Sequence, residues 1–306
     1  MYDLIIIGGG PAGVAAGVYA ARKQLKTLFV TSEWGGQSTV SEDIQNWIGT
    51  AHISGAQLAI NLKAHLEEYK SDIVDIKEGK VTTIKKADEH FTVHTEAGES
   101  YEGKTVLITV GSTRRKMKVP GAMEFDNKGL TYCASCDGPL YGGMDVAVIG
   151  GGNAAFETAA QLLAYSKSVT LLQRGEEYRA DPVTVERVLA NPKMKGITNT
   201  EIVEVKGDKF VKSLTYKDLN DGQIKELSVN GIFVEIGLIP STDLAKDIVE
   251  LDKVGHIVVD PRTQATSIKG IWAAGDCTDG LYHQNNIAAG DAVKALEDIY
   301  MHIHTR

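Results

Sequence analysis

Two stretches of the sequence decide the fold. Residues 3–30 read DLIIIGGGPAGVAAGVYAARKQLKTLFV, and residues 145–172 read DVAVIGGGNAAFETAAQLLAYSKSVTLL. Each runs from a short apolar, β-rich segment through a glycine cluster into an alanine-rich helical segment, and then into a second apolar strand. Because the pattern occurs twice, two chance glycine turns are a poor explanation for it. The repeat predicts two doubly wound α/β units that bind nucleotides.

The spacing of small residues in the two turns predicts how each unit holds a dinucleotide. The first glycine allows a tight turn, the second lets the backbone approach a pyrophosphate, and the third position lets the helix pack against the strand. Unpaired N–H groups at the helix start then face the phosphates. Two such sites imply two dinucleotides, and a flavin with a nicotinamide is the pair that exchanges a hydride. The predicted binding residues are Gly8, Gly10, Pro11, Ala12 and Gly13 in the first copy and Gly150, Gly152, Asn153 and Ala154 in the second, where Ala155 takes the third position.

The second unit is predicted to be inserted into the first. Residues 106–112, VLITVGS, have the pattern of a strand and glycine turn that close the first unit, and Gly111 lies in that turn. Residues 270–276, GIWAAGD, resemble the segment that flavoprotein reductases place against the flavin ribityl chain. Asp276, at its end, would accept a hydrogen bond from a ribityl hydroxyl, and it can cap a helix at the same time. We therefore expect two Rossmann-like three-layer α/β domains, an FAD-binding domain of residues 1–113 and 244–306 and an NAD(P)H-binding domain of residues 117–241.

Composition excludes several classes of protein. The chain has 306 residues and a formal net charge of −8, which argues against nucleic-acid binding because phosphates repel an acidic surface. No apolar run approaches the roughly 18 residues that span a bilayer. The first residues, MYDLIIIGGG, lack the basic segment and the cleavage site of a signal peptide. We therefore expect a cytoplasmic protein with no membrane contact.

The cysteines indicate redox chemistry. Cys133 and Cys136 form a C-x-x-C pair within TYCASCDGPLY (residues 131–141), and Asp137 follows directly. Thiolates in such pairs often have depressed pKa values, and a neighbouring carboxyl can act as a general acid and base. A zinc site would need a second pair, so no metal is expected, and two unrelated core cysteines explain the adjacent acid poorly. A redox disulfide in reach of a flavin is the preferred interpretation, whereas Cys277 is predicted to be a small buried residue.

Taken together, these motifs resemble low-molecular-weight, bacterial-type thioredoxin reductases. The chain is also similar to the C-terminal portion of the flavoprotein subunit of alkyl hydroperoxide reductase. The resemblance covers essentially the whole chain. The matching elements are GGGPAG at 8–13, GGQ at 35–37, NW at 46–47, CASCDGP at 133–139, GGGNAAFE at 150–157, GIFVEIGLIP at 231–240 and AAGDC at 273–277.

The resemblance implies a role for each matching position. Gln37 and Asn46 would contact the flavin, while Asp276 and Gln284 would hold its ribityl chain and ring. Cys133 and Cys136 would form the redox disulfide, with Cys136 nearer the flavin and Cys133 attacking the partner, and Asp137 would move the proton. The resemblance also implies a homodimer, and a nicotinamide domain that rotates between two positions.

The sequence departs from this family at three places. Where thioredoxin reductases carry H-R-R-x-x-x-R, residues 173–179 read QRGEEYR, which keeps Arg174 and Arg179 as the expected grip on the NADPH 2′-phosphate but adds two acids. His283 replaces a basic residue common near the flavin. In the first unit no acid stands squarely at the end of the second strand, although Glu33 follows it.

The expected function is that of a thioredoxin-disulfide reductase. Electrons would pass from NADPH through FAD to the Cys133–Cys136 disulfide and on to thioredoxin or a thioredoxin-like protein. One alternative keeps the chemistry but uses NADH or ferredoxin as the donor and a glutaredoxin-like or peroxiredoxin-linked acceptor. A flavin dithiol oxidase and a non-catalytic redox sensor are the remaining alternatives.

Overall fold

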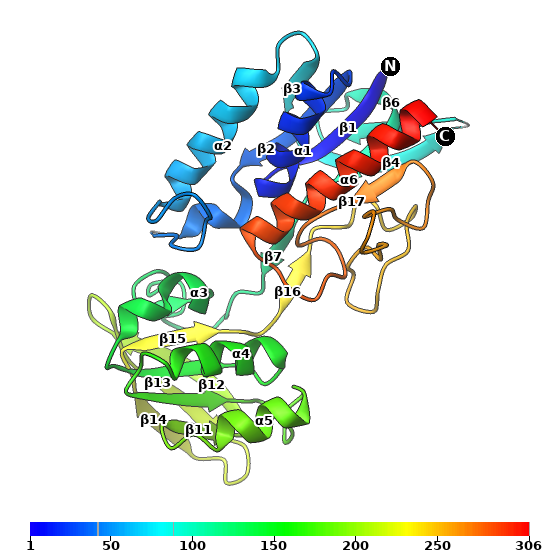
Figure 1. Ribbon diagram of the computed structural model, residues 1–306. Coiled ribbons are helices and arrows are strands. Elements are labelled where there is room, and N and C mark those ends of the chain that lie inside the picture. Colours follow the sequence, from blue (N-terminus) through cyan, green and yellow to red (C-terminus); the bar gives the residue numbers. More distant parts are fainter. Residues whose placement is uncertain (42, 88, 306) are drawn as a thin grey trace. The chain divides into compact units, whose positions relative to one another are not determined.

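The computed structural model divides into two compact units. It describes residues 1–41, 43–87 and 89–305, with the backbone alone at position 136. Unit 1 comprises Met1–Thr113 and Ile239–Arg306, and unit 2 comprises Arg114–Leu238. The chain thus leaves unit 1 once, builds unit 2 and returns, and Figure 1 shows a parallel sheet with helices in each unit. The predicted fold class, two α/β nucleotide-binding domains with one inserted in the other, is confirmed.

Unit 1 is built on a seven-stranded sheet with the strand order β3-β2-β1-β6-β5-β4, in which β17 also pairs with β6. The strands β3, β2, β1, β6 and β17 are parallel, whereas β4, β5 and the first half of β6 form an antiparallel meander. The bounds are β1 (Tyr2–Gly9), β2 (Thr27–Trp34), β3 (Val74–Glu78), β4 (Val81–Ala87), β5 (His90–Thr95), β6 (Ser100–Ile108) and β17 (Ile271–Ala273). The helices are α1 (Pro11–Arg22), the 3-10 helix η1 (Gly36–Val40), α2 (Gly55–Tyr69) and α6 (Asn285–Thr305).

The apolar run of β1 is continuous because the strand is buried on both faces. Leu4 and Ile6 pack into a core with residues of α1, α2 and α6. Ile5 and Ile7 face the opposite way, into a second core with the meander and with residues 244–257. Unit 1 is therefore a three-layer structure, and a charged residue on either face of β1 would be buried.

The helical layer of unit 1 depends on close packing between α1 and α2. A Cβ on Gly17 of α1 would lie 2.9 Å from the Leu66 Cδ1 of α2, so a glycine lets the two helices approach. Leu66 is fully buried, whereas Ile60 on the same helix is 60% exposed. Among the described helices, none combines the length and the apolar character that crossing a bilayer requires.

Unit 2 repeats the parallel architecture on a smaller scale. Its main sheet has the order β11-β10-β9-β15-β8, and a three-stranded antiparallel sheet, β12-β13-β14, accompanies it. The bounds are β8 (Leu130–Thr131), β9 (Asp145–Ile149), β10 (Ser168–Leu172), β11 (Met194–Ile197), β12 (Thr200–Gly207), β13 (Val211–Asp218), β14 (Ile224–Ser228) and β15 (Gly231–Val234). The helices are α3 (Ala134–Asp137), the 3-10 helix η2 (Gly138–Tyr141), α4 (Asn153–Leu162) and α5 (Pro182–Leu189).

The central strand of unit 2 is also buried on both faces. Val146 and Val148 pack with Phe156 of α4. Ala147 and Ile149 pack on the other side, with residues of the antiparallel sheet. The two crossings between the units, β7 (Ser112–Arg114) and β16 (Leu238–Pro240), pair with each other as a two-stranded sheet.

Replacing Leu66 by alanine should destabilise unit 1. The change leaves a cavity between α1 and α2, which costs about 2–5 kcal/mol of the free energy of unfolding. The matched control is Ile60→Ala on the exposed side of α2, which should change the free energy by about 0.5 kcal/mol or less. Urea unfolding followed by circular dichroism measures both, and equal losses would contradict the packing described here.

Candidate functional site

A cavity of about 650 Å³ lies in unit 1 where the glycine turn follows β1. It is lined by the turn itself, by the end of β2, by residues 109–113 after β6, and by the turn after β17. In the sheet order, β1 lies between β2 and β6, so the chain reverses its direction of winding at this point. Ligands of doubly wound sheets bind in the crevice at such a switch point. The volume suits a large ligand, since protein binding pockets commonly measure about 300–1,000 Å³.

The glycines of the turn have three different physical roles. Gly8 has a φ of +120°, and a Cβ there would lie 2.4 Å from the Thr109 carbonyl oxygen. A Cβ on Gly13 would lie 1.8 Å from the Gly8 carbonyl oxygen, so the helix packs directly on the turn. A Cβ on Gly10 would meet no protein atom within 4 Å. The first and third glycines are thus required by the protein itself, and the second faces the cavity.

The start of α1 can receive an anion. Gly10 occupies the N-cap, Pro11 follows at the first helical position, and no described side chain caps the helix. The N–H groups of the first turn and the positive end of the helix dipole therefore point to the cavity side of Gly10. This arrangement fits a pyrophosphate, and the residues present fit a dinucleotide such as FAD.

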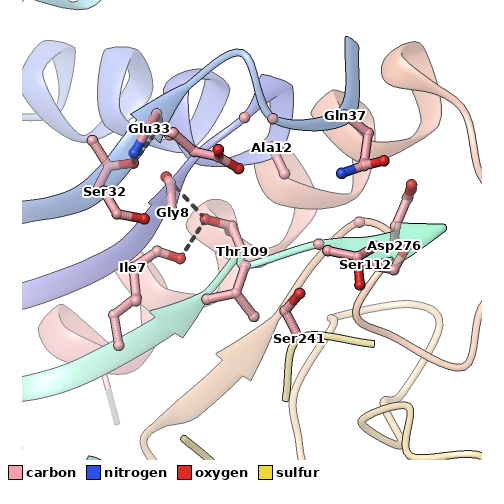
Figure 2. Close-up of a pocket in the computed structure, with 18 of the residues that line it drawn as sticks. Ile7, Gly8, Ala12, Ser32, Glu33, Gln37, Thr109, Ser112, Ser241 and Asp276 are labelled. Carbon is pink, nitrogen blue, oxygen red and sulfur yellow. Dashed lines mark hydrogen bonds between the residues drawn. The ribbon is translucent and has the colours of Figure 1, made fainter. Parts of the chain in front are cut away.

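An acid at the end of β2 completes the dinucleotide pattern. β2 continues to Trp34, so Glu33 lies on the strand rather than after it, and it lines the cavity. An acid about 20 residues after the glycine turn is the residue type that binds ribose hydroxyls. Glu33 looked like a departure from the pattern in the sequence, because the strand was expected to end before it. Figure 2 shows Ser32 and Glu33 toward one end of the cavity and Gln37 and Asp276 toward the other.

Seven of the predicted flavin-binding residues line this cavity. They are Gly8, Gly10, Pro11, Ala12, Gln37, Gly111 and Asp276. Asn46 and Gln284 are not in the cavity lining, but they meet each other, since the Asn46 Nδ2 donates to the Gln284 Oε1 at 3.2 Å. The next residue, Asn285, does line the cavity and accepts a hydrogen bond from the Ser38 hydroxyl at 2.8 Å. Sequence reasoning missed Ser38 and Asn285, because 247 positions separate them.

The turn after β9 in unit 2 has the same construction. Gly150 has a φ of +143°, and its Cβ would lie 2.2 Å from the Glu235 carbonyl oxygen. Gly152 is the N-cap of α4, and a Cβ there would meet nothing within 4 Å. The Asn153 Oδ1 accepts a hydrogen bond from the Asp181 N–H at 2.8 Å, and Ala154 follows in the exposed first turn of α4. The turn can therefore accept a second pyrophosphate.

The segment after β10 lies against this turn. The Arg179 N–H donates to the Gly151 carbonyl at 2.7 Å, and the Gln173 side chain is the nearest neighbour that a Cβ on Gly151 would meet. Arg174 is 80% exposed and forms an ion pair with Glu201 of β12 at 3.3 Å. The two predicted phosphate-binding arginines thus share one loop, but one of them already faces a carboxylate.

The cysteine segment precedes β9 in the chain. Cys133 is disulfide-bonded, and the side chain of Cys136 lies outside the described part of the structure, so their pairing stays a prediction. Asp137 ends α3 and accepts a short hydrogen bond from the Thr131 hydroxyl. Burial, and then the negative charge of Asp137, raise the pKa of Tyr141 to about 12. Thr131 and Tyr141 are neighbours of the predicted acid–base group that sequence reasoning did not name.

The third cysteine has no such setting. Cys277 is a free thiol with no exposed surface. Burial raises its pKa to about 12, which keeps it protonated and unreactive near neutral pH. The prediction of a small buried residue is confirmed.

Gly10→Ala and Gly13→Ala should separate cofactor binding from folding. Gly10→Ala leaves the apoprotein within about 1 kcal/mol of the wild type but weakens FAD binding at least tenfold, because the added methyl group occupies the pyrophosphate position. Gly13→Ala destabilises the apoprotein itself by about 1–3 kcal/mol or more, because the methyl overlaps the Gly8 carbonyl. Flavin content and thermal unfolding of the apoproteins measure both effects. Full FAD affinity in Gly10→Ala would place the cofactor elsewhere.

Comparison with known proteins agrees with this geometry. Residues 2–296 match the model of the pyridine nucleotide-disulphide oxidoreductase family. The chain is 41% identical over 304 residues to the F subunit of alkyl hydroperoxide reductase from Pseudomonas aeruginosa, covering 99% of this chain and 58% of that protein. It is 40% identical over 294 residues to an NADH dehydrogenase of Bacillus subtilis, covering 96% of this chain and 57% of that one.

A solved structure is similar to the chain over its whole length. The thioredoxin reductase of Streptococcus pyogenes aligns with a TM-score of 0.89 and 35% identity, over 100% of this chain and 99% of that one. The chain spans less than three fifths of the two curated relatives named above and almost all of this solved one. The family implies FAD and NAD(P)H as cofactors. The chain belongs to the pyridine nucleotide-disulphide oxidoreductase family.

Proposed function

We propose that this protein is an FAD-dependent disulfide reductase that moves electrons from a reduced nicotinamide to a disulfide of Cys133 and Cys136, and from there to a thioredoxin-like protein. The observation that carries the proposal is the repeat of one glycine-turn geometry in two units of a chain that also holds a disulfide-bonded C-x-x-C cysteine. FAD would occupy the cavity of unit 1, and the nicotinamide dinucleotide would bind at the Gly150–Gly152 turn. FAD, when bound, accepts a hydride and releases electrons in pairs.

The residues of the chain have separate tasks in this reaction. The N-terminus of α1 and Gly10 hold the pyrophosphate of FAD, and Glu33 holds its ribose. In unit 2 the start of α4 holds the second pyrophosphate. Asp137, oriented by the Thr131 hydroxyl, gives a proton to the thiolate that leaves when the disulfide opens, and takes it back later. The Cys133 thiolate then attacks the disulfide of the partner, and the mixed disulfide is resolved by the second cysteine.

Counting electrons tests the disulfide. In an anaerobic dithionite titration followed by flavin absorbance, the wild type should take up two electron pairs, one in FAD and one in the disulfide. Cys133→Ser should take up one pair, because the disulfide is gone. The matched control, Cys277→Ala, should still take up two. A wild type that accepts only one pair would contradict the proposed electron path.

We propose NADH as the donor, although Arg174 and Arg179 led to NADPH as the sequence-based expectation. A 2′-phosphate beside Arg174 would also meet Glu201, which is 3.3 Å from the guanidinium, and the neighbouring loop adds Glu176 and Glu177. Like charges disfavour a phosphate there. The ion pair itself is exposed, and such pairs contribute only about 0–1 kcal/mol, so we expect a preference rather than exclusion.

Glu201→Gln should therefore improve the use of NADPH. Removing the carboxylate releases Arg174 for a 2′-phosphate, so kcat/KM for NADPH should rise about two- to fivefold while that for NADH stays unchanged. Glu204→Gln, on the same strand and paired with Lys206, is the matched control and should change neither value. Steady-state flavin reduction with each nucleotide measures the effect. A wild type that already prefers NADPH would overturn the donor assignment.

The acceptor is tested separately. We expect purified thioredoxin to be reduced with NADH as the donor, read out as the release of thiols. If thioredoxin remains oxidised while a peroxiredoxin-linked thioredoxin-like protein is reduced, the acceptor class shifts toward that of the alkyl hydroperoxide reductase relative.

A further inference from the structure

Glu235 of unit 2 occupies the same position as a cavity residue of unit 1. Thr109 is the first residue after β6, and its N–H donates to the Ile7 carbonyl at 2.8 Å. Its own carbonyl oxygen leaves no room for a side chain on Gly8. Glu235 is likewise the first residue after β15, and its N–H donates to the Ile149 carbonyl at 2.8 Å. Its carbonyl oxygen leaves no room for a side chain on Gly150. Thr109 lines the cavity of unit 1. The internal repeat therefore assigns Glu235 to the equivalent crevice of unit 2.

The sheet order determines which half of a dinucleotide lies near Glu235. In unit 2, β9 lies between β10 and β15, so the strand order reverses between the ends of β9 and β15, where doubly wound sheets bind their ligands. The glycine turn holds the pyrophosphate, and the residues after β10, here Gln173 and Arg174, meet the adenosine ribose. The other half must then extend across the end of β15. This is the nicotinamide half, because the dinucleotide crosses the switch point.

The surroundings of Glu235 give its carboxyl group two charge states near neutral pH. Its Oε1 accepts a hydrogen bond from the Thr158 hydroxyl of α4 at 2.8 Å. Burial raises the pKa of Glu235 to about 7, the Thr158 hydrogen bond and the Arg114 charge on the crossing strand lower it, and Glu157 of α4 raises it. The carboxyl therefore changes from its neutral to its ionised form as the pH rises through about 7.

We propose that the Glu235 carboxyl contacts the nicotinamide half of the bound dinucleotide and, when ionised, holds the cationic oxidised ring more tightly than the neutral reduced ring. This inference rests on the proposed function, because it requires a nicotinamide in unit 2. An opposite charge in contact with the pyridinium ring is favourable in a partly buried site, whereas a neutral ring gains nothing from it. Glu235 would then favour transfer of the hydride away from the donor as the pH rises.

Binding measurements on the FAD-loaded full chain test the proposal without turnover. Three probes are compared by calorimetry at pH 6 and pH 8. They are NAD⁺, 1,4,5,6-tetrahydro-NAD, whose neutral ring transfers no hydride, and ADP-ribose, which lacks the ring. In the wild type, the preference for NAD⁺ over the tetrahydro analogue should increase roughly tenfold between pH 6 and pH 8. Glu235→Gln should abolish this increase and leave ADP-ribose binding unchanged.

Two further variants strengthen the test. Glu226→Gln is the matched control, since that carboxylate also accepts a hydroxyl hydrogen bond, from Ser213 at 2.6 Å, but lies on the antiparallel sheet of unit 2. It should keep the wild-type pH dependence. Thr158→Val removes the hydrogen bond that lowers the pKa of Glu235, so the midpoint of the pH dependence should move to higher pH. This variant provides a second reading if Glu235→Gln folds poorly.

Each contrary result has its own meaning. An unchanged preference and pH dependence in Glu235→Gln would overturn the inference and leave the proposed function standing. So would an equal loss for ADP-ribose and NAD⁺, because the contact would then not involve the ring. A wild type that binds none of the three probes would overturn the proposed function, and this inference with it.

Discussion

Contact between two backbone segments at the end of a central strand underlies both nucleotide units. The turn after β1 lies against the carbonyl of Thr109, and a Cβ on Gly8 would lie 2.4 Å from that oxygen. The turn after β9 lies against the carbonyl of Glu235, and a Cβ on Gly150 would lie 2.2 Å from that oxygen. Both glycines also have φ values that side chains rarely adopt. Each turn leads directly into a helix whose first N–H groups have no intrahelical partner and can bind phosphate.

The two units share this backbone arrangement but differ in the residues at the ends of their strands. Unit 1 has Glu33 at the end of β2, so a ribose with free hydroxyls fits there. Unit 2 has Gln173 directly after β10 and an ion-paired Arg174 beside it. After the opposite strand, unit 1 has the neutral Thr109 and unit 2 the titratable Glu235. The two units therefore share one backbone arrangement at the glycine turn and differ in the side chains at the ends of the flanking strands.

The segment between the first crossing and β9 holds the C-x-x-C pair and the acid that follows it. Cys133 and Asp137 lie on either side of one short helical turn, and the Asp137 N–H donates to the Cys133 carbonyl at 3.0 Å. Thr131 serves both residues, because its hydroxyl donates to Asp137 and accepts from the Cys133 N–H. The Thr131 hydroxyl thus links the disulfide-bonded Cys133 to Asp137 within one short segment. Cys277, by contrast, is buried in the core of unit 1, where desolvation suppresses the thiolate.

The sequence alone determined the two α/β nucleotide-binding units and the insertion of one unit in the other. It also predicted the redox chemistry of the C-x-x-C pair, which stays a prediction. These features follow from local steric demands and from periodicity, both of which can be read within a short window. Only the tertiary structure decided what depends on strand ends and strand order. It showed that β2 carries Glu33 into the cavity, that Ser38 meets Asn285, and that Arg174 faces Glu201. Thr158 and Glu235 are 77 positions apart and meet because β9, which leads into α4, lies beside β15 in the sheet. Side-chain pairing between distant segments leaves no periodic signal in the sequence, so the sequence could not predict this contact.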